Sequence, residues 1–562
     1  MASLTKSRTL FAFTSPRTIE KIIPEIRLLD ERFAGQKWNA KLQEAYFGAL
    51  FDSDFYEGEA RPKDPAFAAR DRITRAPKAL GFVDLKDSVA ITPAGKALLN
   101  GKRVDEVITR QLLKFQLPSP NHTQSSEVTF GVKPYLELLR LTKELDGISM
   151  TEIALFFTQM THYRHYGDVM KKIQRFREQS RQNRKNRKEF VEEQFQIQLK
   201  KIYAAEIRAG VTGTRESADS SLAKFLATKR SNLRDYADAF VRYLRATKLV
   251  TFNVQTSRLR ISEFRQADVD FILQSVRREP ENFSNKGNFN AWLFDSQQPA
   301  LLSDDRGALE RKLEMLGLTA INKTKNIEWL KDQIEILEAE AAKNQMEELT
   351  GSLKSFDGFQ EIEAVFEQIR NREIPDAPLY FEWNIWRAMV MLNDAINITG
   401  NFRLDLDGAP LSSAPGNTPD IECEYENFNL IVEVTLSSGQ KQFEMEGEPV
   451  ARHYGKAQQL SEKPTYCLFV ANKLNPGAVA HFFNLNRLNT AAYGGKTRII
   501  PISLDVFRGM LLKAKEANFQ DARYLEFFLK SVVESGRAAK DDEDELGWLA
   551  VIREKAGNWC RV

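Results

Sequence analysis

Two carboxylates in the C-terminal part of the chain have the types and the spacing of metal ligands. Asp420 directly follows Pro419, and Glu433 comes thirteen positions later, inside the apolar run 430–434. An ionised glutamate in a segment with the pattern of a buried strand is costly unless a cation compensates it. Two carboxylates on adjacent strands can hold a hard cation such as Mg²⁺. The pair therefore predicts a site for metal-assisted hydrolysis, although the same spacing also arises by chance.

Further candidate site residues lie close to this pair in the sequence. Glu382 is embedded among aromatic residues on a predicted helix, whereas Glu446 and His453 are seven positions apart on another and share one face of it. Thr435 shares a strand face with Glu433, because side chains two positions apart point the same way. If these acids and the imidazole converge, they suit one or two Mg²⁺ ions and a water to be deprotonated. The simpler interpretations are a surface acid, an acid favoured by a helix N-terminus, and a packed histidine.

Length and composition bound the class of protein. A chain of 562 residues is too long for one core, so roughly two to four domains are expected. Its 42% hydrophobic and 28% charged residues are ordinary for a soluble globular protein. No apolar run approaches the ~20 residues of a membrane span, and the N-terminus has no signal-peptide pattern. The three cysteines, Cys423, Cys467 and Cys560, are widely spaced, which indicates neither a disulfide framework nor zinc. We expect a cytoplasmic protein.

The first half of the chain is predicted to form helical modules that end in short hairpins. A predicted helix at 70–80 precedes a strand-like hairpin at 82–92, and Thr92 should cap a helix that starts at Pro93. The same order recurs at 220–262. These patterns predict winged helices, which place one helix in the DNA major groove and basic residues on the phosphates. Winged helices also serve as protein–protein modules, so one alone would be weak support for DNA binding.

Basic residues on and around these modules are candidates for DNA contacts. A run from Lys171 to Phe190 holds nine Lys or Arg against two Glu, which indicates either phosphate contacts or a solvated helix face. Two modules together with this run favour DNA binding. The candidate DNA-binding residues are Arg17, Arg70, Arg72, Arg75, Lys78, Lys229, Arg230 and Arg234.

The pattern changes towards the C-terminus. Residues 277–304 are rich in Asn, Ser, Gln and Pro and indicate a connector, and residues 305–372 are charged and helical. Strand-like runs then alternate with helices, which predicts a mixed α/β sheet. These runs are residues 402–405, 421–425, 430–436, 465–471 and 498–503. The predicted organisation is a mainly α recognition region at 1–275, a linker at 276–350 and an α/β domain at 351–562.

Several segments resemble the AlwI-like type IIS restriction endonuclease family, which includes PleI- and MlyI-type enzymes and site-specific nicking endonucleases. The similarity is carried by Gly-Asn-Thr-Pro-Asp at 416–420, Glu-Val-Thr at 433–435 and Phe-Glu-Met-Glu-Gly-Glu-Pro-Val-Ala-Arg-His-Tyr at 443–454. It extends to Ser15-Pro16-Arg17, Arg70-Asp71-Arg72, Ile-Thr-Pro-Ala-Gly-Lys at 91–96 and Phe381-Glu382-Trp383. The resemblance therefore covers nearly the whole chain.

The resemblance implies winged-helix-like recognition subdomains, a helical linker and a C-terminal nuclease domain of the PD-(D/E)xK fold. Such an enzyme reads a short asymmetric duplex sequence, here of the GAGTC kind, and cleaves a few base pairs outside it with Mg²⁺. The metal ligands carried over are Asp420, Glu433 and Glu446, and Glu382 and His453 complete the catalytic set. The implied partners are double-stranded DNA, a cognate methyltransferase in the host and, for an otherwise monomeric enzyme, a transient second chain for double-strand cleavage.

One departure and two rival functions remain open at this point. The general motif has Lys where this chain has Thr435, so that His453, Lys456, Lys441 or a second metal must take the role of the lysine. One rival is a non-catalytic winged-helix DNA-binding regulator, which leaves the buried Glu433 unexplained. The other is a strand-specific nickase or the large subunit of a heterodimeric restriction enzyme.

Overall fold

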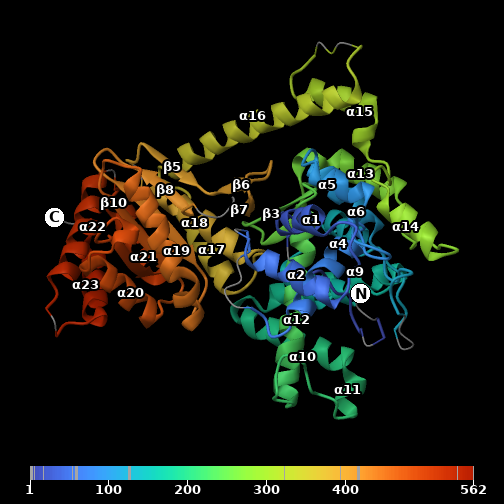
Figure 1. Ribbon diagram of the computed structural model, residues 1–562, viewed down its shortest axis with the longest axis horizontal. Coiled ribbons are helices and arrows are strands. Elements are labelled where there is room, and N and C mark those ends of the chain that lie inside the picture. Colours follow the sequence, from blue (N-terminus) through green and yellow to red (C-terminus); the bar gives the residue numbers. More distant parts are fainter. Residues whose placement is uncertain are drawn as a thin grey trace. The chain divides into compact units, whose positions relative to one another are not determined.

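The computed structural model describes two compact units, Met1–Ala339 and Glu340–Val562 (Figure 1). It describes the whole chain except residues 1–3, 6, 17, 54, 57–60, 124–127, 320, 322, 393, 414–417, 520, 541 and 561–562, and residue 184 by its backbone alone. The boundary between the units falls inside helix α16 (Ile327–Leu353) and inside the predicted linker at 276–350. None of the described helices is both long and apolar enough to cross a membrane.

The first unit is mostly helical and carries two short antiparallel hairpins, β1 (Val83–Asp84) with β2 (Ala90–Ile91) and β3 (Val250–Asn253) with β4 (Arg258–Ile261). Its helices before residue 200 are α1 (Ile19–Phe33), α2 (Ala40–Phe51), α3 (Pro65–Thr74), α4 (Ala76–Ala79), α5 (Pro93–Leu99), α6 (Val104–Lys114), α7 (Pro134–Glu144), α8 (Met150–Leu155), α9 (Tyr166–Gln182) and α10 (Arg187–Ile202). The later helices are α11 (Ala204–Arg208), α12 (Leu222–Arg245), α13 (Gln266–Ser275), α14 (Lys286–Phe294) and α15 (Arg306–Met315).

In the N-terminal module, residues 19–99, hydrogen bonds join the hairpin to the turn that follows the first helix. The N–H of Gly35 donates to the carbonyl of Val89 at 2.9 Å, and the N–H of Val89 donates to the carbonyl of Gln36 at 2.8 Å. The order along the chain is therefore helix α1, turn, helix α2, helices α3 and α4, and hairpin. The hairpin itself remains a two-stranded sheet.

The helix after this hairpin begins where the sequence predicted. Thr92 caps α5, because its Oγ1 accepts the N–H of Gly95 at 3.0 Å, and Pro93 is the first helical residue. A side chain at Gly95 would overlap the carbonyl oxygen of Phe82, so glycine permits the close approach of helix and hairpin. The predicted helix at 70–80 is wrong in one respect, because it is divided at Arg75 into α3 and α4.

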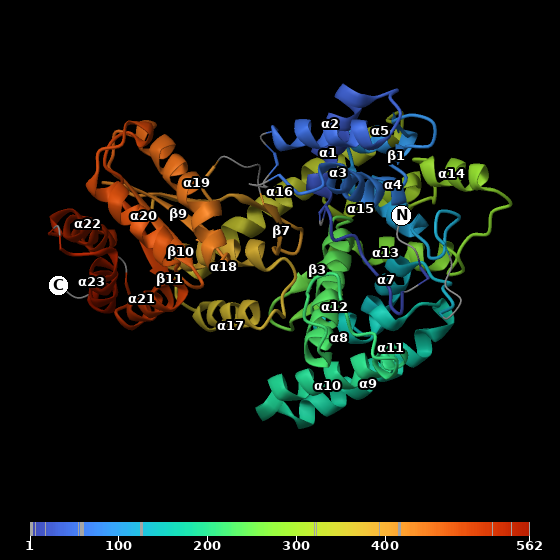
Figure 2. The same cartoon turned by 60° about the horizontal axis from the view of Figure 1, so that its bottom comes forward.

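The central module, residues 134–261, repeats this order with one large insertion. Ile148, which follows α7, forms an antiparallel bridge with Leu259 of β4, with N–H···O distances of 2.9 and 2.8 Å. Helix α8 comes next, and α12 precedes the β3–β4 hairpin. Residues 156–221 are inserted between α8 and α12, and the helices that they contain, α9, α10 and α11, lie at the outer edge of the first unit (Figure 2).

The second unit is built on a five-stranded mixed sheet in the order β11-β10-β9-β8-β5. Its strands are β5 (Asn397–Gly400), β8 (Ile421–Glu424), β9 (Asn429–Thr435), β10 (Thr465–Ala471) and β11 (Ile499–Ser503). Strands β9, β10 and β11 are parallel, whereas β8 and β5 are antiparallel to their neighbours. β6 (Phe402–Leu404) and β7 (Pro410–Ser413) form a separate antiparallel pair.

Helices cover this sheet and set the position of the acidic residues. They are α17 (Phe359–Arg370), α18 (Ala377–Met391), α19 (Gln440–Gln459), α20 (Pro476–Arg487), α21 (Leu504–Glu516), α22 (Ala522–Ala538) and α23 (Glu545–Asn558). Helix α18 packs against β5, β7 and β9, and α19, which connects β9 to β10, packs against both of these strands. The apolar side chains of α19 join a core with the sheet and α20, formed by Ile431, Val450, Ala451, Tyr454, Cys467, Phe469, Ala471, Ala478, Phe482 and Ile499.

The predicted mixed sheet is confirmed, and its central strands match the sequence-based boundaries within one or two residues. The β-branched and aromatic content of β9, β10 and β11 explains this agreement, because such residues fit a buried pleated surface. The strand predicted at 402–405 forms, as β6, but it pairs with β7 outside this sheet. The sequence did not predict β5 and β7, which are short and partly exposed.

Candidate active site

The pairing of β8 with β9 brings Asp420 against Glu433. Ile421 lies opposite Val432 in the antiparallel register, and one further step along it places Asp420 opposite Glu433. Asp420 Oδ2 accepts the N–H of Val434 at 2.7 Å, which fixes the carboxylate beside β9. The side chains of residues directly opposite in an antiparallel pair lie on the same face of the sheet. The two acids predicted from sequence are therefore neighbours on one face.

Helix α19 brings two further predicted residues to the same face. His453 Nδ1 lies 2.8 Å from Glu433 Oε1, and the two side chains are only 11% and 7% exposed. Glu446 Oε1 accepts a hydrogen bond from the Thr435 hydroxyl at 2.6 Å. Glu446 and His453, seven positions apart on α19, thus contact Thr435 and Glu433, which are two positions apart on β9. Because α19 begins at Gln440, Glu446 lies in its second turn, and the alternative that Glu446 serves only the helix N-terminus is wrong.

The electrostatics of this face favour binding of a cation. Burial raises the pKa of Asp420 well above its usual value, and the neighbouring Glu433 and Glu446 raise it further, whereas the hydrogen bond from Val434 lowers it. The pKa of Glu433 is likewise raised, first by burial and then by Glu446 and Glu382; Arg452 is the main opposing charge. The carboxylates repel one another in a poorly solvated place, and a bound cation would relieve that repulsion.

His453 is placed to act as a base. Burial is the main cause that lowers the pKa of His453, the charges of Arg452 and Lys456 add to it, and together they bring it to about 4, so that the ring is neutral near pH 7. Its Nδ1 faces Glu433, and its Nε2 is buried without a hydrogen-bond partner among the described residues. A neutral imidazole whose Nδ1–H donates to a carboxylate keeps the lone pair of Nε2 for accepting a proton.

Thr435 positions one of the acids. The sequence showed only that Thr435 stands where the general motif has a lysine. Its hydroxyl donates to Glu446 and accepts the N–H of Ser437 at 3.0 Å, and the side chain is buried. Thr435 therefore orients Glu446 toward the sheet. Arg452 was missed altogether by the sequence analysis, where its adjacency to His453 was the only available signal. The proposed lysine substitutes, Lys441 and Lys456, are both exposed.

Glu382 comes to this region from α18. Helix α18 packs against β9, and Glu382, unlike its buried neighbours Phe381 and Trp383, is partly exposed. Its charge is one of those that raise the pKa of Glu433. The structure therefore places Glu382 near the acid pair.

The carboxylates of this face are suitable ligands for a divalent cation. Carboxylate oxygens are the preferred ligands of Mg²⁺, which commonly takes one or two carboxylates and keeps several waters. Asp420 and Glu433 meet that requirement, and their raised pKa values show that no nearby cationic side chain fully compensates them. Within the described parts of the chain, no three His, Cys, Asp or Glu side chains form a closed metal cage. The residues present therefore fit a metal held by two carboxylates and water better than an all-protein cage.

The DNA-binding candidates of the N-terminal module differ in how far they are already engaged. Arg17 lies outside the described residues. Arg72 makes an ion pair with Glu25, whose side chain is 1% exposed, and this pairing raises the pKa of the Arg72 guanidinium despite its burial. Arg75 pairs with Asp71 at 2.6 Å. Arg70 is exposed and lies over the ring of Phe67, 5.2 Å from its centroid.

The remaining candidates pack on neighbouring helices. Lys78 is half-buried, and burial and the charge of Lys286 lower its pKa. On α12, Lys229 lies over the ring of Tyr203 at 5.0 Å, Arg230 pairs with Glu192, and Arg234 lies 4.9 Å from the centroid of Phe195. Of the described candidates, Arg70 therefore has the side chain most accessible to DNA.

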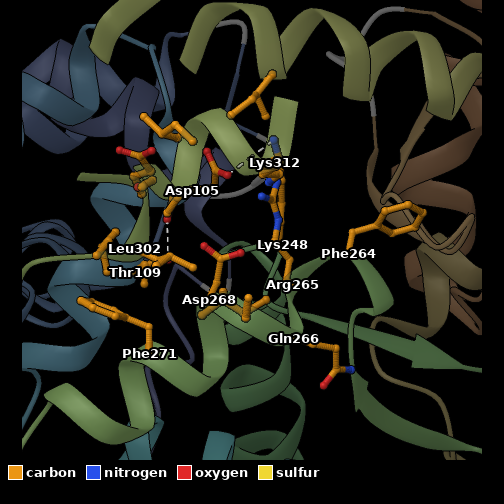
Figure 3. Close-up of a pocket in the computed structure, with 18 of the residues that line it drawn as sticks. Asp105, Thr109, Lys248, Phe264, Arg265, Gln266, Asp268, Phe271, Leu302 and Lys312 are labelled. Atoms are coloured by element: carbon orange, nitrogen blue, oxygen red, sulfur yellow. Dashed lines mark hydrogen bonds and ion pairs between the residues drawn. The ribbon is translucent and has the colours of Figure 1, made fainter. Parts of the chain in front are cut away.

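The first unit also contains a cavity of about 740 Å³ between α6, α13, α15 and α16. Asp105 and Asp268 extend into it, together with Lys248 and Arg265 (Figure 3). Glu338 on its wall is held by Arg265 at 2.9 Å and by Lys312 at 2.8 Å. The charge of Glu338 is therefore matched by two cations, in contrast to the acids of the second unit.

Comparison with known proteins agrees with an enzyme that acts on DNA. The model of the AlwI restriction endonuclease family matches residues 78–510, which is more than half of the chain. The chain belongs to the AlwI restriction endonuclease family. It is a restriction endonuclease, an enzyme that cleaves DNA at specific sites, and restriction endonucleases generally use divalent metal ions.

Two solved structures show a more distant likeness. The small subunit (R.BspD6I2) of the heterodimeric restriction endonuclease R.BspD6I is 26% identical over 35% of this chain and 98% of its own, with a TM-score of 0.30. The BpuJ1 endonuclease binding domain, in complex with pyrene- and phenanthrene-modified DNA, is 13% identical over 52% of this chain and 95% of its own, also with a TM-score of 0.30. At these TM-scores neither likeness establishes a shared fold. No curated protein matches the sequence.

Proposed function

We propose that the second unit is a PD-(D/E)xK nuclease domain in which Asp420 and Glu433 hold Mg²⁺, with Glu446 as a supporting third carboxylate, for the hydrolysis of DNA phosphodiesters. The observation that carries this proposal is the placement of Asp420 against Glu433, with His453 2.8 Å from Glu433. The fold supports it, because the acids lie on adjacent central strands of a mixed sheet and α19 between β9 and β10 supplies the other residues.

The roles of the residues follow from their contacts. A divalent cation would supply the positive charge that acidifies the attacking water and offsets the charge that develops on the phosphate. Glu433 keeps His453 in the tautomer whose Nε2 is an acceptor, so that His453 can take the proton of the attacking water. Thr435 holds Glu446 in place by a 2.6 Å hydrogen bond, and Glu382 adds to the negative charge that attracts the cation.

The first unit is proposed to read DNA through two winged helices. The supporting observation is that the N-terminal and central modules share one order of elements, and in both the segment after the first helix is hydrogen-bonded to the final hairpin. In winged helices the helix before the hairpin enters the major groove, which corresponds here to α3–α4 and to α12. Arg70, Lys78, Lys229 and Arg234 remain the candidate contacts. Arg72, Arg75 and Arg230 are weaker candidates, because each pairs with an acid.

We further propose type IIS cleavage, a few base pairs outside a short asymmetric sequence of the GAGTC kind. The resemblance to the family supports this, as does the division of the chain into two compact units. We propose that recognition (1–275) and cleavage (351–562) lie in different parts of the chain, with a linker at 276–350. A host that carries such an enzyme must protect its own DNA, which is the basis for expecting a cognate methyltransferase.

Run-off sequencing of a digested plasmid library tests this assignment. We expect one short asymmetric sequence next to cuts at a constant offset, with Mg²⁺ and not with EDTA. Cuts inside the recognised sequence would contradict type IIS cleavage, and undiminished cutting in EDTA would contradict the role of the acids.

A strand-specific nickase is the second candidate. The second unit offers one Asp420–Glu433 pair, and a single catalytic centre cuts one strand in one visit. Supercoiled plasmid that accumulates as open circles under prolonged digestion would favour the nickase or a subunit of a two-chain enzyme. Linear product that appears with a second-order dependence on protein concentration would favour a transient dimer.

A further inference from the structure

The turn between α9 and α10 has an unusual composition. Residues 179–188 contain five cations, namely Arg181, Arg184, Lys185, Arg187 and Lys188, and no acid, and the other five residues are Gln, Ser and Asn. This segment is the tip of the helical hairpin that the central module inserts between α8 and α12. It lies at the outer edge of the first unit (Figure 2). We call it the basic tip.

The hairpin behind the basic tip is firmly anchored. Phe176 of α9 stacks on Phe190 of α10 with ring centroids 5.5 Å apart, and Phe156 packs edge-on against Phe176. Arg177 is fully used for anchoring: its guanidinium donates to Glu152 at 2.7 and 3.0 Å, and to the carbonyl oxygens that precede and follow Asp146. The hairpin therefore presents the basic tip on a rigid support.

The lysines of the tip are not explained by local stability. Lys185 and Lys188 are exposed and form no hydrogen bond or ion pair with the described residues. Arg187 and Lys188 open α10, where the positive end of the helix dipole favours acids over cations. By contrast, Lys200 and Lys201 lie in the last turn of the same helix, where the dipole favours them. Lys185 and Lys188 thus place positive charge where the fold gains nothing from it.

We infer that the basic tip binds the phosphate backbone of duplex DNA and carries no base readout. An enzyme that cleaves DNA must neutralise phosphates. Lysines that form no ion pair within the protein can do so without disturbing the fold. The Gln, Ser and Asn side chains around them are further donors to phosphate oxygens. The inference rests on the DNA-binding part of the function alone and does not depend on the metal or on the proposed cleavage chemistry.

The test compares two double variants of the full-length enzyme in EDTA, where no cleavage interferes. Lys185→Gln/Lys188→Gln removes two charges of the tip, and Lys200→Gln/Lys201→Gln removes two exposed lysines from the other end of α10. Fluorescence anisotropy gives Kd over a range of salt concentrations for a duplex with the recognised sequence and for an unrelated duplex. For the tip variant we expect the slope of log Kd against log salt to fall by about 1 to 2, since each phosphate contact contributes about 0.9.

The expected loss of affinity is the same factor on both duplexes, so that the specificity ratio stays constant. An unchanged slope would overturn the inference, and so would an equal decrease in the Lys200/Lys201 control. A loss confined to the recognised sequence would also overturn it, because that result indicates base readout. Thermal melting of all variants confirms that they fold. The slope of log Kd against log salt can be measured even if the protein binds no metal and cleaves no DNA, so the test is independent of the proposed chemistry.

Discussion

Glu338 in the first unit and the pair of Asp420 and Glu433 in the second are poorly solvated carboxylates that differ in how their charge is compensated. In the first unit, burial raises the pKa of Glu338, but Arg265 and Lys312 lower it more, and its pKa ends below the usual value. In the second unit the pKa values of Asp420 and Glu433 are raised by burial and by other acids. The first arrangement stabilises the fold. In the second arrangement the carboxylates repel one another, and a bound cation would relieve this repulsion. Such perturbed pKa values are typical of functional sites.

The largest expected effect concerns catalysis. Asp420→Asn or Glu433→Gln should reduce cleavage by on the order of 10³-fold or more, because each removes a charged ligand from the reacting site. Specific DNA binding should stay within a small factor of the wild type. Parallel plasmid digestion and anisotropy measurements distinguish the two effects. Substantial turnover by either variant with Mg²⁺ would remove the basis of the site assignment.

The matching change in the first unit should affect stability and leave the chemistry alone. Glu338→Gln leaves Arg265 and Lys312 without their charge partner, which should cost about 3 kcal/mol of the free energy of unfolding, the scale of a broken buried ion pair. Denaturant unfolding measures this cost. If Glu338→Gln were neutral and Asp420→Asn strongly destabilising, the contrast between the two groups would be reversed.

The hydroxyl of Thr435 should matter through Glu446. Thr435→Val keeps the shape of the side chain but removes the donor, and we expect metal affinity to fall by roughly 10- to 100-fold, as for other residues that orient ligands. Thr435→Ser should restore most of it. Activity against Mg²⁺ concentration, together with the shift in Tm on adding Ca²⁺, measures the effect. Equal behaviour of the Val and Ser variants would assign Thr435 to packing only.

The contribution to stability should depend on pH with opposite signs for the pair of Asp420 and Glu433 and for Glu338. Asp420 and Glu433 have raised pKa values, so they destabilise the ionised fold in EDTA, and this cost disappears as pH falls through those values. Asp420→Asn should therefore stabilise the protein near neutral pH, with a gain that shrinks toward about pH 4. Glu338 has a lowered pKa, so its stabilisation is present above the unfolded value and is lost as pH falls through the folded one. Unfolding free energies of Asp420→Asn and Glu338→Gln across pH decide the signs.

Much of the site was predictable because it depends on local periodicity. The alternation along β9 places Glu433 and Thr435 on one face, and the seven-residue spacing of Glu446 and His453 places them on one face of α19. The run of residues in the central strands fixed their boundaries. What could not be predicted was which face of α19 meets which face of β9, because that depends on the apolar side chains Val450, Ala451 and Tyr454 packing on the sheet.

The DNA-binding candidates show the opposite case. Arg70 and Arg72 look alike in the sequence, yet Arg72 pairs with Glu25, 47 positions away, and Arg70 is exposed. Nothing in the spacing of either residue indicates that difference. The basic tip was visible as a charge run, whereas the anchoring of Arg177 and the solvent exposure of Lys185 and Lys188 were not.

The sequence by itself determined the acid pair, the mixed sheet and the family, because strand periodicity, apolar patterning and motif residues are properties of neighbouring positions. The tertiary structure alone decided which charges are compensated. It paired Glu338 with Arg265 and Arg72 with Glu25, left Asp420 and Glu433 facing each other, and turned Thr435 toward Glu446. The physical reason is that the energy of a buried charge depends on the groups within a few ångströms of it, and folding brings those groups together from distant parts of the chain.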